Sequence, residues 1–192
     1  MVNYNEENGE VQFKTIKSIR KLSHDKPGKC TSIDQIVSAQ PGLVPRMSGC
    51  HTRDRITAAT CFFEYKSSFG YTHLCTSTDQ EQTLISKAAY EKLADTHGVQ
   101  IEAYHADNGR FAEKGFREAV ANSNQTITFC GVGSHHQNAL VERYIEEITK
   151  LGRTVLLHAK RHWKEAISTV LWPFAIRAVK DMRNHLKLDL KG

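Results

Sequence analysis

The sequence of 192 residues has no apolar run that approaches the length of a membrane-spanning helix. Such a helix needs about 18–20 consecutive apolar residues. The first twenty residues, MVNYNEENGEVQFKTIKSIR, are polar and lack the apolar centre of a signal peptide. These absences exclude a membrane protein and argue against secretion. We therefore expect an intracellular protein of the nucleus or cytoplasm.

Paired cysteines are also lacking. The chain has five cysteines, an odd number, and no CxxC pair. Several lie within apolar runs such as TCFFEY and TITFCG. This pattern is typical of buried free thiols in a reducing compartment, and it does not suggest a disulfide framework or a cysteine-based zinc site.

Acidic residues are scarce in the last third of the chain. Residues 1–134 carry 15 Lys or Arg against 15 Asp or Glu, whereas residues 135–192 carry 11 against 6, which accounts for the whole net charge of +5. A basic segment is compatible with a polyanionic partner such as nucleic acid. By itself it fits an ordinary solvated helical surface equally well.

Turn-forming residues divide the chain into short segments. Residues 1–29 show little periodicity and predict a tail or linker. Apolar runs and alternation predict strands over 30–38, 56–66, 70–78, 99–105 and 125–131. Helical spacing predicts helices over 78–98, 110–123, 135–160 and 162–186, with Pro173 marking a kink or boundary in the last.

The order of these segments favours one fold class. Three early strands followed by alternating helices and strands predict an α/β domain with a mixed five-stranded sheet and helices on both faces. The ribonuclease H-like fold has this arrangement. We expect its core over residues 30–160, with residues 161–192 as a C-terminal helical extension.

Three acidic residues stand out by their positions. Asp34 lies within an apolar strand, where a carboxylate is costly unless it is paired or binds a cation. Asp107 directly follows a strand in the sequence HADNG, although Asp-Asn-Gly is also a common turn. Glu142 lies on the predicted long helix, on a face that also carries basic residues. Carboxylates from separate elements can hold a pair of divalent cations for phosphoryl transfer, since Mg²⁺ prefers oxygen ligands.

Helical geometry separates two faces of the long helix. One face carries polar and charged groups, and from spacing alone it could be a solvated surface with i,i+4 ion pairs. Its members are Asn138, Glu142, Glu146, Lys150 and Arg153. The opposite face is predicted to pack in the core, through Leu140, Tyr144, Ile148, Leu151 and Val155.

The motifs resemble the integrase core of copia-type long-terminal-repeat retroelements. YHADNGRF is similar to that family's Asp-Asn-Gly after a strand, and HHQNALVER to its Gln-Asn-Gly-x-x-Glu-Arg at the start of a helix. FFEYKSSFGYTHL (62–74) resembles the second and third strands of the family, and SIDQ (32–35) matches the place of its first catalytic Asp. The resemblance covers roughly residues 30–186.

The resemblance implies a function and a set of site residues. Asp34, Asp107 and Glu142 would be the catalytic and metal-binding residues, holding Mg²⁺ or Mn²⁺, with two ions expected. The activity would be processing of the element's DNA ends and strand transfer into target DNA, by a homo-oligomer. Basic and polar residues of the long helix would contact DNA. These are Asn138, Arg143, Lys150 and Arg153.

Some features depart from the family pattern. Between Asp107 and Glu142 there are 34 residues, one fewer than is usual in integrases, and Ala139 stands where Gly is common. No complete zinc-binding domain precedes the core in this sequence. A second hypothesis is therefore an inactive or domesticated core that binds DNA or a protein. A third, a nuclease of the same fold that acts on RNA–DNA hybrids, agrees less well with HHQNALVER.

Overall fold

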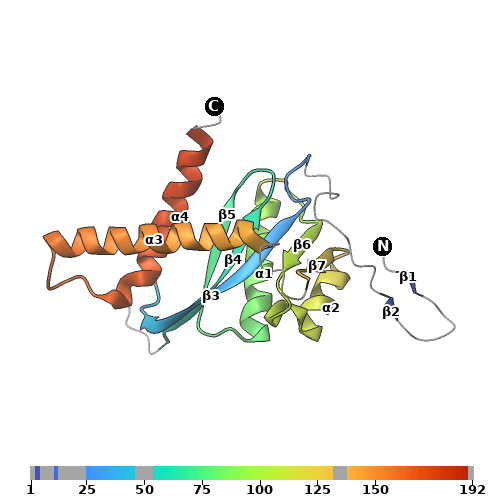
Figure 1. The fold of residues 1–192 in the computed structure, drawn as a ribbon, viewed down its shortest axis with the longest axis horizontal. Coiled ribbons are helices and arrows are strands. Elements are labelled where there is room, and N and C mark those ends of the chain that lie inside the picture. The colour runs from blue at the N-terminus through green and yellow to red at the C-terminus, as the bar shows by residue number, and fades with distance from the viewer. Residues whose placement is uncertain (1–2, 5–10, 13–24, 46–53, 132–137, 190–192) are drawn as a thin grey trace.

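The computed structural model describes residues 3–4, 11–12, 25–45, 54–131 and 138–189 (Figure 1). The predicted start of the long helix at His135 lies outside these residues. Near the N-terminus, β1 (Asn3–Tyr4) and β2 (Val11–Gln12) pair with each other and form a ladder separate from the main sheet.

The main sheet has five strands, as predicted, and β3 lies at its centre. The order is β5 (Gly70–Cys75), β4 (Ile56–Glu64), β3 (Thr31–Gly42), β6 (Ala103–Ala106) and β7 (Thr126–Phe129). The β3–β4 and β4–β5 pairs are antiparallel, whereas β6 pairs parallel to β3, and β7 parallel to β6. The sheet is therefore mixed, and its antiparallel and parallel halves meet at β3.

β3 is longer than the predicted strand, which ended at residue 38. It continues to Gly42 with an irregularity in its pairing after Val37. The extension is held by the last helical region, because the Trp172 indole Nε1 donates to the carbonyl of Gln40 at 2.8 Å. A Cβ on Gly42 would lie 2.6 Å from that same indole nitrogen, so a residue without a side chain is needed there.

The helices agree with the predicted order. Asp79 caps α1 (Gln80–Thr96) by accepting a hydrogen bond from the Gln82 amide at 2.9 Å, and Gly98 follows the helix with φ of +69°. The predicted helix over 110–123 is a short 3₁₀ turn, η2 (Arg110–Ala112), followed by α2 (Lys114–Asn122). No helix in the described part of the chain is long and apolar enough to cross a membrane.

The last predicted helix, over 162–186, is helical only in its later part. α3 (Ala139–His162) is followed by a non-helical stretch, then by the 3₁₀ turn η4 (Thr169–Leu171) and by α4 (Trp172–Asp189). Pro173 is the second residue of α4. The predicted boundary is therefore correct, and proline occupies the first turn, where its missing N–H is not needed.

Two apolar clusters lie on the two faces of the sheet. Phe62 of β4 points to one face, where it stacks on Tyr90 of α1 with ring centroids 4.5 Å apart. Phe63 points to the other face, where it packs beside Tyr144 of α3 at 5.8 Å. α1 and α2 thus cover one face, and the crossing pair α3 and α4 covers the other.

The buried face of α3 differs from the predicted stripe. Tyr144 and Ile148 are buried as expected, but the other predicted core residues are half-exposed: Leu140 (37%), Leu151 (44%) and Val155 (36%). Val141 and Gly152 are buried in their place. The cause is α4, whose Ile176 side chain approaches Gly152 so closely that a Cβ there would lie 3.2 Å away.

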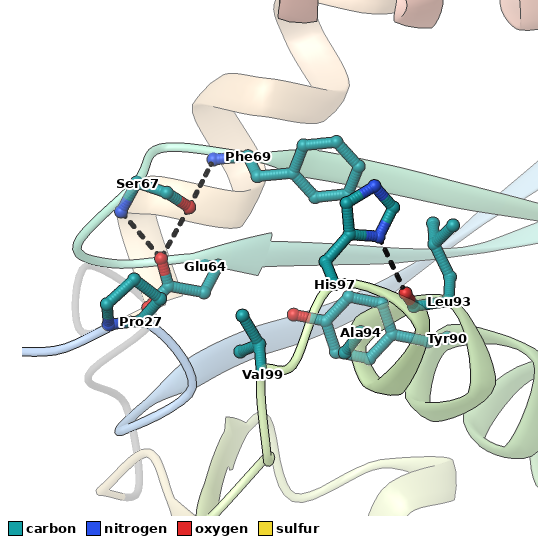
Figure 2. A pocket seen from close by; sticks show the side chains of 9 residues that line it. All are labelled: Pro27, Glu64, Ser67, Phe69, Tyr90, Leu93, Ala94, His97 and Val99. Carbon is teal, nitrogen blue, oxygen red and sulfur yellow. Dashed lines mark hydrogen bonds between the residues drawn. The ribbon is translucent and has the colours of Figure 1, made fainter.

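A buried carboxylate, that of Glu64, accepts hydrogen bonds from chain segments near the start of β3. Glu64, 3% exposed, accepts hydrogen bonds from the Ser67 amide and hydroxyl, both at 2.6 Å, from the Lys66 amide at 3.1 Å and from the Gly28 amide at 3.3 Å. Beside it is an apolar cavity of about 220 Å³ (Figure 2). The cavity is lined by Pro27, Glu64, Ser67, Phe69, Tyr90, Leu93, Ala94, His97 and Val99, a set that includes no predicted site residue.

Glu64→Gln tests this arrangement. The substitution replaces one carboxylate oxygen, which accepts hydrogen bonds from backbone amides, by an NH₂ group, which can only donate. We expect the free energy of unfolding to fall by about 2–3 kcal/mol, since net contributions of hydrogen bonds to charged groups are of that size. Glu102→Gln is the control. It breaks an exposed pair with Lys29 (2.7 Å) and should cost less than about 1 kcal/mol. Equal losses in urea denaturation would contradict the role given to Glu64.

Candidate active site

Asp34 lies on the central strand and is half-buried. Its Oδ1 accepts a hydrogen bond from the Gln35 amide at 2.7 Å. The pKa of the Asp34 carboxyl is raised from 3.8 to about 6, chiefly by burial; the hydrogen bond from the Gln35 amide lowers it, and the charges of Asp107 and Glu142 contribute to the rise. The other two acidic residues therefore lie near enough to act on this carboxyl.

Asp107 follows the last residue of β6. The parallel β3–β6 ladder ends at the Ile33–Ala106 pair, so Asp34 and Asp107 are the next residues on two neighbouring parallel strands. The Gly109 amide donates to Asp107 Oδ1 at 3.2 Å, and a Cβ on Gly109 would lie 3.2 Å from each carboxylate oxygen. The glycine thus leaves space beside the carboxylate.

Two asparagines attach the site loops to the sheet. Asn108 donates from Nδ2 to the carbonyl of Cys130, after β7, at 2.9 Å. Asn138, the residue before α3, donates from Nδ2 to the carbonyl of Ile33 at 3.1 Å. Asn138 was predicted to contact DNA, but its side chain is 1% exposed and faces the sheet.

Glu142 lies in the first turn of α3, and its side chain is exposed. The Cys130 thiol is affected by the charges of all three acidic residues. Burial raises the pKa of this thiol, and the charges of Asp107, Glu142 and Asp34 raise it further. The three carboxylates, which come from β3, from the loop after β6 and from α3, therefore all lie near enough to act on this thiol.

The donor set suits a divalent cation in its chemistry. Three carboxylates are hard oxygen donors, and the raised pKa of Asp34 shows that an added negative charge is disfavoured there without a cation. Within the described ranges, no three His, Cys, Asp or Glu side chains already stand in a metal-binding arrangement.

The remaining predicted DNA-contacting residues lie along α3 with exposed side chains. Lys150 forms an ion pair with Glu146 one helical turn earlier. Arg143 and Arg153 are exposed as well, and the structure gives no ion pair for either among the residues that it describes. Arg153 also borders an apolar groove between β3, α3 and α4. The free positive charge of this face thus comes from the two arginines more than from Lys150.

Sequence reasoning missed the buried polar groups under the site. His105, 1% exposed, shares hydrogen bonds with Thr128 Oγ1 at 2.8 Å and with the Cys130 thiol at 3.5 Å. The alternation of β6 and β7 places these side chains together, but pairing of two parallel strands far apart in sequence cannot be read from either strand alone.

Solved structures share this fold. No protein-family model and no curated protein matches the sequence. An intasome of simian T-cell lymphotropic virus, solved with the PP2A regulatory subunit B56 gamma, contains a chain that is 13% identical, with a TM-score of 0.56 over 78% of this chain and 47% of that one. The present chain thus spans about half of that protein.

Two further matches are structures of the HTLV-2 integrase catalytic core domain in complex with magnesium. The trimeric form is 14% identical, with a TM-score of 0.51 over 80% of this chain and 83% of that one. The dimeric form is also 14% identical, with a TM-score of 0.50 over 80% and 84%. The fold is therefore ribonuclease H-like and similar to a retroviral integrase core, as predicted.

Asp34→Asn tests the electrostatics of the carboxylate cluster. Because the pKa of Asp34 is raised from 3.8 to about 6, the stability contributed by its protonated form is present below about pH 4 and is lost as pH rises through 6. Asparagine keeps the acceptor for the Gln35 amide and cannot ionise. We expect the melting temperature of the variant in EDTA to exceed that of the parent by about 2–4 °C at pH 7.5, and to equal it at pH 4. A variant that melts lower at pH 7.5 would refute this description.

Proposed function

We propose that this chain is the catalytic core of a retroelement integrase of the copia type, a metal-dependent polynucleotidyl transferase acting on DNA. One observation carries the proposal: of the residues that match the family's motifs, Asp107 and Glu142 both act on the Asp34 carboxyl, and all three act on the Cys130 thiol, in a fold similar to retroviral integrase cores. The magnesium present in the matched HTLV-2 cores supports the choice of cation.

In this proposal the three carboxylates hold two Mg²⁺ or Mn²⁺ ions. The ions, when bound, would activate the attacking oxygen and stabilise the leaving oxygen of a phosphodiester. Asp34 and Asp107 are fixed by neighbouring strands, and a bound cation would offset the burial and the neighbouring negative charges that raise the pKa of Asp34. Glu142 approaches from α3, and its exposed side chain is free to turn toward the ions.

The DNA contacts in this proposal come from the exposed basic face of α3. Arg143 and Arg153 follow Glu142 along α3 with exposed side chains, so they can contact backbone phosphates near the reacting one. The partners would be the element's DNA ends and target DNA. Assembly into a homo-oligomer is supported by the dimeric and trimeric forms of the matched cores.

The packing of α4 supports the proposed domain limits. α4 covers the sheet together with α3, so the helical extension after residue 160 belongs to the same folded unit as the core. Ahead of the core, Gly28 bonds through its amide to Glu64 and through its carbonyl to the amide of Glu102 at 2.8 Å. The end of the proposed linker is therefore attached to the domain.

A second candidate function is that of an inactive core that binds DNA or a protein. The observation that favours it is that no three candidate ligands in the described ranges are already placed around a cation position. The basic surface of α3 and the fold would serve binding equally well. Metal-dependent strand joining separates the two functions, since the inactive core would bind DNA and join nothing.

Asp107→Asn tests the proposed metal-dependent enzyme activity. The change keeps the side chain's size and the Gly109 turn but removes a charge that the cations need. We expect strand joining with Mg²⁺ or Mn²⁺ to fall by about 100-fold or more, because loss of even an outer-shell partner costs about 10–100-fold. DNA affinity, measured by fluorescence anisotropy, should stay close to that of the parent.

Arg153→Ala is the complementary variant, and Lys150→Ala is its control. Arg153→Ala should weaken DNA binding and flatten its salt dependence, whereas Lys150→Ala should do so less, because Lys150 is paired with Glu146. If the parent joins strands and Asp107→Asn does so equally well, the metal mechanism is wrong. If the parent joins no DNA with either cation, the binding function takes its place.

A further inference from the structure

Asn138 uses its side chain in an unexpected way for a residue that precedes a helix. Asparagine at such a position commonly accepts a hydrogen bond from an amide of the first turn. Here the side chain makes no capping bond. Its Nδ2 instead donates to the carbonyl of Ile33, a residue 105 positions earlier on the central strand, at 3.1 Å.

The bond lies where the three site elements meet. The β3–β6 ladder stops at the Ile33–Ala106 pair, and the Asn138 amide binds the Ile33 carbonyl at that end. Asp34 is the next residue of β3, and Glu142 lies four positions after Asn138, about one turn into α3. The bond therefore joins the backbone that carries Asp34 to the helix that carries Glu142.

The other contacts of the first turns of α3 are less specific about its position. Val141 and Tyr144 are buried against the sheet, and apolar packing tolerates small shifts and rotations of a helix. The Tyr144 hydroxyl bonds to Thr72 Oγ1 at 2.8 Å, but this bond lies two strands away from β3, on β5. A directional bond to Ile33 sets the distance between the start of α3 and β3.

The buried amide also has a cost that an apolar residue would avoid. Asn138 is 1% exposed, and its Oδ1 has no hydrogen-bond partner among the residues that the structure describes. An unmet buried acceptor is destabilising, so a leucine of similar size would suit simple packing better. The presence of asparagine at this buried position is explained if its hydrogen bond to the Ile33 carbonyl positions the residues of the site.

We propose that Asn138 is a positioning residue, which sets the separation of Asp34 and Glu142 by bonding the start of α3 to the central strand. This inference rests on the proposed function, in which those carboxylates share cations. It replaces the DNA contact predicted for Asn138 with a role that acts through the backbone. Asn138 itself touches neither substrate nor metal in this account.

The test compares Asn138→Ala and Asn138→Leu in the full chain, both of which remove the donor, while leucine also fills the volume. Val120→Ala is the control, because Val120 is 1% exposed on α2, on the other face of the sheet, and its truncation lowers stability without touching Asn138. Two quantities are measured on folded protein: Mn²⁺ affinity by calorimetry, and amide hydrogen exchange of residues 139–143 without metal.

We expect either Asn138 variant to bind Mn²⁺ about tenfold or more weakly than the parent, in the range found when supporting residues of metal sites are changed. Exchange at 139–143 should also be faster, and Val120→Ala should change neither quantity in this way. Parental Mn²⁺ affinity in both Asn138 variants, or an equal loss in Val120→Ala, would overturn the inference.

A parent that binds no Mn²⁺ would refute the proposed metal site, and hydrogen exchange alone would then decide the position of α3. Faster exchange at 139–143 in a folded Asn138 variant, without the same change in Val120→Ala, supports the bond as the fixing contact. Unchanged exchange overturns it. The two failures are thus told apart, and the leucine variant keeps the test valid if the alanine variant does not fold.

Discussion

The parallel ladder between β3 and β6 is the constraint on which the candidate site depends. It ends at Ile33 and Ala106, and the chain places an aspartate immediately after each of them. The Asn138 bond to the Ile33 carbonyl then brings α3 to the same end of the ladder. Elements that are far apart in sequence therefore present their carboxylates to one edge of the sheet.

This arrangement concentrates negative charge near the end of the β3–β6 ladder. The pKa values of Asp34 and of the Cys130 thiol are raised first by burial and then by the neighbouring carboxylates. Further along α3, beyond Glu142, Arg153 presents a positive charge to solvent. A negative centre beside a positive helix face suits a chemistry in which cations and a polyanion bind together.

Local signals in the sequence predicted most of the fold. The predicted helix over 78–98 agrees with α1, Pro173 marked a boundary close to the start of α4, and the five strands were found from apolar runs and alternation. The extension of β3 to Gly42 was missed because it depends on Trp172, which packs on it from a distant part of the chain.

The same limit applies to α3 and to the site. Periodicity gave the helix, but the close approach of Ile176 to Gly152 decided which residues face the core. For Asn138 the sequence motif drew attention to the right residue and predicted the wrong surroundings, because a hydrogen bond to a strand 105 positions away leaves no trace in local spacing. Motif similarity named the three acidic residues, and strand pairing explains how two of them become neighbours.

The most direct test of the central claim is a crystal structure of the protein with Mn²⁺, with the metal located by its anomalous scattering. The account predicts a manganese peak bound by carboxylate oxygens of Asp34 and Asp107, with Glu142 turned toward the same region. Crystals soaked at saturating Mn²⁺ that show no metal at these residues, or metal only elsewhere on the molecule, would contradict it.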